Sequence, residues 1–241
     1  MLAAATSLTE LLSFGDKGYG DELAWGVLNT IQISIFGYAF GLALGLLGAV
    51  GKLSGGKYLR YALDFYTTIG RAVPELVLIL LLYYAGTDSF NALIGLFGHD
   101  PVQVNGMVAA IFVLGLVQGA YSTEVLRAAI QAVPIGQLEA ARAYGMTPWK
   151  MFSRVTLPAM LPNAIPGLAN LWLNITKDSA LISVVGFTEL ALATRQAAGV
   201  SKQYFLLYVV AQIIYLTISN FSGFLFNRLE QRVRRGQPKL V

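Results

Sequence analysis

The chain has 241 residues, of which 56% are hydrophobic and only 12% charged, and its mean hydropathy is +0.61. Soluble domains carry about 25% charged residues, so the composition excludes an ordinary soluble enzyme and indicates an all-α membrane domain over residues 1–241. The net charge of +4 does not indicate nucleic-acid binding, because the basic residues lie between apolar segments. Without cysteine and with His99 as the single histidine, we expect neither thiol chemistry nor a metal site.

Five apolar segments are predicted to cross the membrane as helices, since each is long enough for a hydrocarbon core about 30 Å thick. They cover residues 23–51, 61–85, 101–123, 155–176 and 203–227. The first basic residue is Lys17, so the N-terminus lacks the positive region of a cleaved signal peptide. We therefore expect the first segment to remain in the mature protein.

The first segment carries Gly37, Gly41 and Gly45 at every fourth position, which predicts close packing of a neighbouring helix. Just beyond it, the spacing of Gly51 and Gly56-Lys57 imitates a phosphate-binding loop. Tyr58 replaces the Ser or Thr that such a loop needs, and the segment follows a membrane helix rather than a strand. We expect no nucleotide cofactor in this chain.

Charged residues lie within the second segment. Arg71 is about 11 residues beyond Arg60, or roughly 16 Å along a helix, and a charge at the bilayer centre costs about 2.5–3.5 kcal/mol. This segment must therefore face protein or water. Arg71 and Glu75 are spaced to pair on one helical face, with Asp64 on nearly the same stripe. We interpret these three residues as candidates for a polar solute pathway; the alternative is an intrahelical salt bridge that only fixes packing.

The fourth segment contains prolines at every fourth position, Pro158, Pro162 and Pro166. They favour a regular helix that starts only near Pro166, although a start near Pro158 stays open. Lys177 would lie near the midplane in the first case and near the outer surface in the second. Lys177 and Asp178 are further pathway candidates, with a structural gate as the alternative, and on a helix they point about 100° apart. Residues 187–199 are predicted to form a short surface helix.

The longest polar interruption is predicted to form a helix–turn–helix finger at residues 134–158. Pro134 suits a first helical turn, and residues 137–144 are rich in good helix formers. Gly145 suits a left-handed helix end. Thr147 and Pro148 fit the cap and first position of a second helix.

The positive-inside rule gives an orientation. Twelve of the 17 Lys and Arg residues lie in the loop after the first segment, in the finger region and in the C-terminal tail. Lys17, Arg195 and Lys202 lie on the opposite side, and the remaining two, Arg71 and Lys177, are assigned to the membrane spans. The finger and the C-terminus are therefore predicted to be cytoplasmic and the N-terminus outside.

Within the finger, Glu139-Ala140-Ala141 is followed after three residues by Gly145, and after nine more by Val155, one residue and Leu157-Pro158. This spacing resembles the EAA loop of the membrane permeases of bacterial ABC importers, with Val155 in place of Ile. Motifs at residues 71–77, 119–124 and 177–181 stand in an order similar to that of polar amino-acid permeases, especially those of histidine/lysine–arginine–ornithine and opine systems. The alternative is a surface helix with a Glu139–Arg142 pair.

The resemblance implies a permease of the type I importer (MetI-like) fold, multi-pass in the bacterial inner membrane. It implies that the finger is a cytoplasmic coupling loop. The residues implied in ATPase coupling are Glu139, Ala140, Ala141, Gly145, Leu157 and Pro158. The implied partners are two copies of an ATP-binding subunit that holds ATP and Mg, a sister permease or a second copy of this chain, and a periplasmic substrate-binding protein. The permease itself would not be an enzyme.

The implied solute is a polar, preferably basic, amino acid: histidine, arginine, lysine, ornithine or an opine. Glu75 favours a cationic solute, whereas Arg71 beside it weakens that inference. One rival interpretation is an ion-coupled secondary transporter in which Glu75 carries the proton and Arg71 modulates it. Inverted repeats would favour that rival, but five segments do not divide into equal halves. A second rival, a non-transporting membrane scaffold, has no use for charges inside the membrane.

Overall fold

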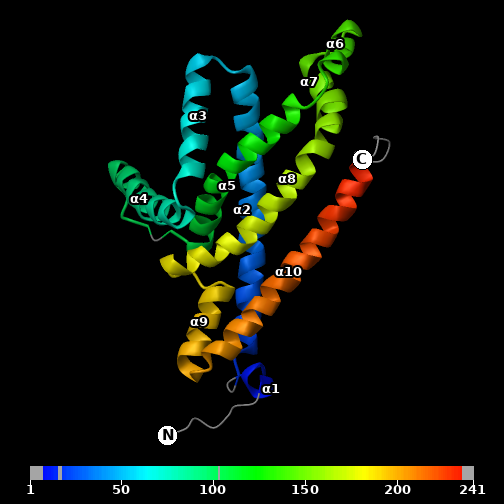
Figure 1. Cartoon of the computed structure of the whole chain (residues 1–241). Coiled ribbons are helices and arrows are strands. Elements are labelled where there is room, and N and C mark those ends of the chain that lie inside the picture. The colour runs from blue at the N-terminus through cyan, green and yellow to red at the C-terminus, as the bar shows by residue number, and fades with distance from the viewer. Residues whose placement is uncertain (1–7, 16–17, 103, 235–241) are drawn as a thin grey trace.

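The computed structural model describes residues 8–15, 18–102 and 104–234, and every regular element within them is helical (Figure 1). Lys17, Arg235 and Lys239, which enter the charge count, lie outside these ranges. The elements are α1 (Leu8–Leu11), α2 (Gly20–Ser54), α3 (Lys57–Ala72), α4 (Glu75–Leu96), α5 (Gly106–Gln131), α6 (Ile135–Ala143), α7 (Pro148–Met151), η1 (Phe152–Thr156), α8 (Leu157–Asp178), η2 (Ser179–Val185), α9 (Leu190–Ser201) and α10 (Tyr204–Val233).

Four of the described helices, α2, α4, α5 and α10, are long and apolar enough to cross a membrane. The all-α membrane class is thus confirmed, whereas the number of five spans and the orientation stay predictions. The helix predicted at 101–123 starts later, at Gly106, where Asn105 caps it by accepting from the amides of Met107 and Val108. It extends to Gln131, so Glu124 lies inside α5 rather than at its end.

The long helix α2 is the centre of the molecule, and α5 packs against it (Figure 1). Its glycines are buried in this contact. A Cβ added to Gly41 would lie 2.9 Å from Gln118 Cβ, and one added to Gly45 would lie 2.9 Å from the carbonyl carbon of Ser122. The predicted close approach of a neighbouring helix is confirmed, because only a missing side chain admits α5 at this distance.

The single helix predicted over residues 61–85 was wrong. α3 ends at Ala72 and α4 begins at Glu75, with Val73 and Pro74 extended between them at ψ 139° and 132°. Proline has no amide hydrogen and disfavours the helical conformation of the residue before it, so the chain breaks here. The predicted Arg71–Glu75 pair was also wrong, because the two residues belong to different helices; Arg71 Nε instead donates to the Thr67 carbonyl at 3.1 Å.

The prolines of the fourth segment do not delay its helix. α8 starts at Leu157 and carries Pro162 and Pro166 in its interior, which favours the alternative of a start near Pro158. Prolines spaced by four remove hydrogen bonds along one face only, so the amides on the other faces still hold the helix. Asn170 and Lys177 are exposed along α8, and Leu171 and Ile175 are buried.

The short helix predicted at 187–199 exists as α9, and one of its faces is buried against neighbouring helices. α9 packs between α2 and α10, and Leu190, Ala193, Ala197 and Ala198 form a buried stripe with Leu207 of α10. The stripe follows the helical spacing of three and four residues. α9 lies at the end of the molecule opposite to α6 and α7 (Figure 1).

Candidate functional site

The predicted finger is confirmed as a local structure. α6 follows Pro134 and ends before Gly145, whose φ of +70° is the left-handed conformation that favours glycine. Thr147 Oγ1 accepts from the Lys150 amide at 3.4 Å, and Pro148 is the first residue of α7. The finger projects away from the other helices (Figure 1), so its outer face is available to another molecule.

The residues predicted for ATPase coupling divide into two groups. Glu139, Ala140, Gly145 and Pro158 are exposed, whereas Ala141 is buried and Leu157 packs against a buried cluster around Met160. The exposed group can contact a partner, and the buried group fixes the finger on α8.

The tip of the finger also presents two large aromatic side chains that the motif did not predict. Tyr144 is 85% exposed and Trp149 is 73% exposed. Beside Tyr144, the finger and the start of α8 enclose a hollow of about 560 Å³ whose lining includes Ala140, Arg154 and Pro158. Exposed aromatics next to a hollow are typical of protein interfaces. The sequence signal that could have predicted these interface residues is the presence of two large aromatic residues in a polar loop.

The finger continues into α8 without a loop. α7, the π-helical turn η1 and α8 follow each other directly from Pro148 to Asp178. Thr156, the residue before α8, does not cap this helix with its side chain. Its Oγ1 instead donates to the carbonyl of Met151, five residues earlier, at 3.5 Å. Single π turns are frequent at functional positions. The chain thus joins the exposed finger directly to the interior helix that ends in Asp178.

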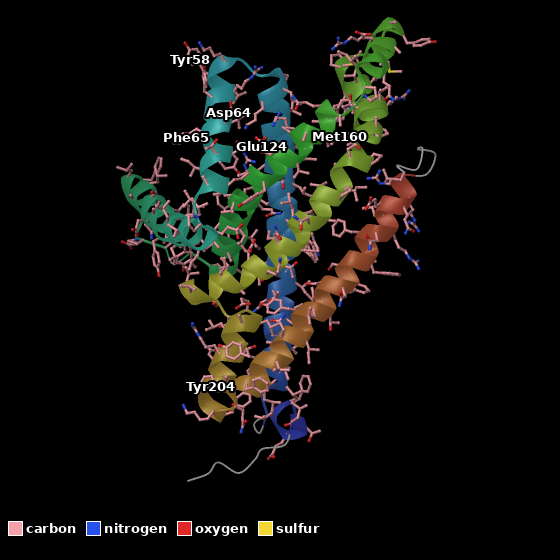
Figure 2. The ribbon with its side chains drawn as sticks, in the orientation of Figure 1. Tyr58, Asp64, Phe65, Glu124, Met160 and Tyr204 are labelled. Carbon is pink, nitrogen blue, oxygen red and sulfur yellow. The ribbon has the colours of Figure 1, made fainter. Side chains whose placement is uncertain are left out.

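A polar cleft of about 580 Å³ opens where α2, α3 and α5 meet, and Asp64, Arg71 and Arg60 are among its lining residues. At its base the Lys52 side chain, only 6% exposed, places Nζ 2.7 Å from Asp64 Oδ1 and 2.6 Å from Glu124 Oε1. Figure 2 labels Asp64 and Glu124, which come from α3 and α5.

Further hydrogen bonds complete this lysine network. Lys52 Nζ donates to Thr67 Oγ1 at 2.6 Å, and Arg127 donates twice to Glu124 Oε2, at 3.0 and 2.7 Å. Lys52 and Glu124 were missed as a pair by sequence reasoning, because they are 72 positions apart. The network ties three helices together with its charges matched.

A second acidic site lies at the break between α3 and α4. Glu75, the first residue of α4, is close enough to interact with Tyr121 of α5 and with Asp178, the last residue of α8. Lys177 is exposed and Asp178 is partly buried. Of the five pathway candidates, Asp64 and Arg71 line the cleft, Glu75 and Asp178 meet, and Lys177 stands apart.

A buried acid that sequence reasoning missed holds α9 in place. Glu189 is 0% exposed and caps α9 by accepting from the amides of Ala191 at 2.9 Å and Leu192 at 2.8 Å. Its carboxylate also accepts from the Tyr215 hydroxyl of α10 at 2.9 Å and from Thr30 Oγ1 of α2 at 3.4 Å. The available sequence signal was the position of Glu189 directly before an apolar helix, where an acid can act as the N-cap.

Most of the chain matches one known protein family. The family described as "Binding-protein-dependent transport system inner membrane component" matches residues 41–235. The chain belongs to this family. Its members are inner membrane components of transport systems, and the predicted resemblance to amino-acid ABC importer permeases is confirmed by the relatives.

Among curated relatives, the nopaline transport system permease protein NocQ of Agrobacterium fabrum is 41% identical over 228 residues, covering 94% of this chain and 97% of that protein. The histidine/lysine/arginine/ornithine transport system permease protein HisQ of Escherichia coli is 36% identical over 219 residues, covering 91% and 96%.

Among solved structures, an amino acid ABC transporter with histidines matches with a TM-score of 0.74 and 29% identity, over 89% of this chain and 95% of that chain. The inward-facing MetNI methionine transporter matches with a TM-score of 0.69 at 22% identity, over 88% and 96%, which concerns the fold alone. The type I importer permease fold is therefore confirmed.

Proposed function

We propose that this chain forms one half of the translocation pathway of an ATP-driven importer in a bacterial inner membrane, and that its solute is a polar amino acid with a cationic side chain. ATP and Mg would be held by a partner ATPase, to which the finger transmits conformational change. The observation that carries this proposal is the exposed finger of family spacing, joined without a loop to a helix that ends in an acidic site.

The proposed assembly contains two ATP-binding subunits beneath two permeases. The second permease is a sister chain, with a second copy of this chain as the alternative. A substrate-binding protein would deliver the solute on the outer face, near α9, since the finger lies at the opposite end. In the proposed cycle, ATP closes the ATPases, the finger follows its docking surface, and hydrolysis restores the inward-facing pore.

The finger contact has the chemistry of a protein interface. Ala140 has a small side chain that lets a partner helix approach, Tyr144 and Trp149 supply exposed aromatic area, and Glu139 supplies a charge. A few residues, often aromatic, supply most of the binding energy of an interface, at about 2 kcal/mol or more each. The position of these residues on α6, the turn after it and α7 supports docking in a groove.

The coupling role is tested with the double variant Gly145→Pro, Glu139→Lys. Proline cannot adopt the positive φ of Gly145, and lysine reverses the charge at position 139 of α6. We expect ATPase affinity to fall by about tenfold or more, since about 1.4 kcal/mol is a factor of ten, and import to fall with it. Co-purification and vesicle uptake measure both.

A matched control changes a glycine of positive φ and an acidic residue elsewhere. Gly98, which also has a positive φ of 78°, and Asp100 lie in the loop after α4, so Gly98→Pro, Asp100→Lys should retain the ATPase. If the finger variant still binds its ATPase and imports normally, the finger is not the coupling element. Uptake that runs on an ion gradient without ATP would instead support the ion-coupled rival.

The cationic solute is inferred from the carboxyl groups of Glu75 and Asp178, which meet at the α4, α5 and α8 junction. Two adjacent carboxylates suit a guanidinium or ammonium group, because they accept charge-assisted hydrogen bonds. Arg71, released from the predicted pair with Glu75, lines the cleft on the other side of the break.

Removing either acid is expected to lower uptake of arginine and lysine by about tenfold, since a hydrogen bond to a charged group contributes about 1.5–3 kcal/mol. Uptake with Glu75→Gln and Asp178→Asn checks this, with glutamine as the neutral comparison solute. Asp88→Asn, an exposed acid of α4, is the control. Equal loss for glutamine and arginine would show a structural role rather than recognition of charge.

A further inference from the structure

A second hollow lies on the outer face of α2, α8 and α10, away from the polar cleft. Its volume is about 340 Å³, and its lining consists of Tyr38, Trp172, Ser222, Leu225, Phe226 and Leu229. The Tyr38 hydroxyl is already used, because it donates to the Leu168 carbonyl at 2.8 Å. The hollow therefore offers an occupant mainly hydrocarbon contact.

The surroundings of the hollow are apolar as well. α2 and α10 are two of the helices that can cross a membrane. On α10, Leu225 and Leu229 at the hollow are about half exposed, and so is Phe224 beside them. Because the residues in and around this hollow are apolar and half exposed, this side of the helices suits the hydrocarbon region of the bilayer, where an acyl chain is the natural occupant.

Two arginines lie on α10 at and just beyond one end of this hollow. Arg232 is one turn past Leu229, at the spacing that places side chains on one face. The Arg228 guanidinium lies over the Phe224 ring, 4.6 Å from its centre. Over the described part of α10 the ion pair is Arg234–Glu230 at 2.8 Å, and neither Arg228 nor Arg232 has an acidic partner.

We propose that this site binds an anionic phospholipid. One acyl chain fills the hollow beside Trp172 and Phe226, and the phosphate lies between Arg228 and Arg232. Guanidinium groups bind phosphate with paired hydrogen bonds. Two unpaired arginines favour a lipid with net negative charge over one whose choline group cancels the phosphate charge, and basic pockets at the ends of membrane helices commonly bind such headgroups.

The position of the site gives the lipid a structural role. Trp172 of α8 and Phe226 of α10 both line the hollow and contact each other with ring centres 6.4 Å apart, and Trp172 also packs edge-on against Tyr38 of α2 at 5.4 Å. An acyl chain in the hollow would lie against both rings, and so against the helix that carries the finger and against α10. The lipid would therefore stabilise the contact between α8 and α10.

The test uses the full chain purified from membranes, with any subunits that accompany it, in nanodiscs of equal phosphatidylglycerol and phosphatidylcholine with identical acyl chains. Native mass spectrometry counts the retained lipids. We expect wild type to retain phosphatidylglycerol about tenfold over phosphatidylcholine, and Arg228→Gln, Arg232→Gln to lose that preference. Ser222→Phe, which fills the hollow from its buried serine, should reduce retention of both lipids.

The charge-matched control is Arg195→Gln, Lys202→Gln, which removes two positive charges from exposed residues at and after α9. It should keep the wild-type preference. The proposal is overturned if wild type shows no preference, if the α10 double variant keeps it, or if the control loses it equally. If Ser222→Phe retains as much lipid as wild type, the acyl chain does not occupy the hollow, and the proposal is also overturned.

Discussion

Lys52→Met is expected to lower the free energy of unfolding by about 3 kcal/mol, because it leaves Glu124 with Arg127 alone and Asp64 with no cation. Lys52 is buried and contacts both acids within 2.7 Å. Asp64 is half exposed, so most of the destabilisation comes from Glu124. We therefore use the low end of the roughly 3–5 kcal/mol that it costs to break a buried ion pair. Thermal or denaturant unfolding of the purified chain in detergent measures the change.

The comparison variant is Lys57→Met, which removes an exposed lysine at the start of α3. Surface substitutions usually change stability by less than about 0.5 kcal/mol. The triple variant Lys52→Met, Asp64→Asn, Glu124→Gln removes the uncompensated charges and should regain part of the loss. If Lys52→Met costs no more than Lys57→Met, this network does not hold α3 against α2 and α5.

Glu189→Ala is expected to lower the free energy of unfolding by about 3 kcal/mol. It removes the cap of α9, which contributes about 1 kcal/mol, and it leaves the partly buried Tyr215 hydroxyl without its acceptor, at about 1–3 kcal/mol. Glu189→Gln keeps one acceptor oxygen and should fall between wild type and alanine. The same unfolding measurement applies.

The control for Glu189→Ala is an alanine substitution of a more exposed acid, Glu230. Glu230 pairs with Arg234 on the partly exposed end of α10 at 2.8 Å, and such surface pairs contribute about 0–1 kcal/mol. Glu230→Ala should therefore change stability little. Equal effects of Glu189→Ala and Glu230→Ala would contradict the role of Glu189 as the link between α2, α9 and α10.

The finger could be predicted because its signals are local. Pro134, Gly145 and Thr147 each restrict the backbone or cap a helix within a few residues, and the structure uses all three as expected. The break at Pro74 carried an equally local signal, since Val73 precedes a proline. The apolar pattern continues across Pro74, however, and by itself it predicts a single helix.

The contacts between helices could not be predicted in the same way. Helical spacing tells which face a residue occupies, but not which residue of a distant helix lies opposite. Lys52 and Glu124, or Glu75 and Asp178, therefore met only in the folded chain. The stripe of α2 glycines was the exception, because small residues predict close contact whatever the partner.

The absence of a loop between α7 and α8 has a mechanical consequence. α8 has 22 residues, which span about 33 Å at 1.5 Å per residue. It can therefore tilt as a rigid body when the finger moves. If the pivot lies at η1, a tilt of about 5° would swing the far tip by about 3 Å. That stroke is as long as a hydrogen bond, enough to part Asp178 from Glu75. A displacement of Trp149 would then move Asp178, which lies in the proposed solute site.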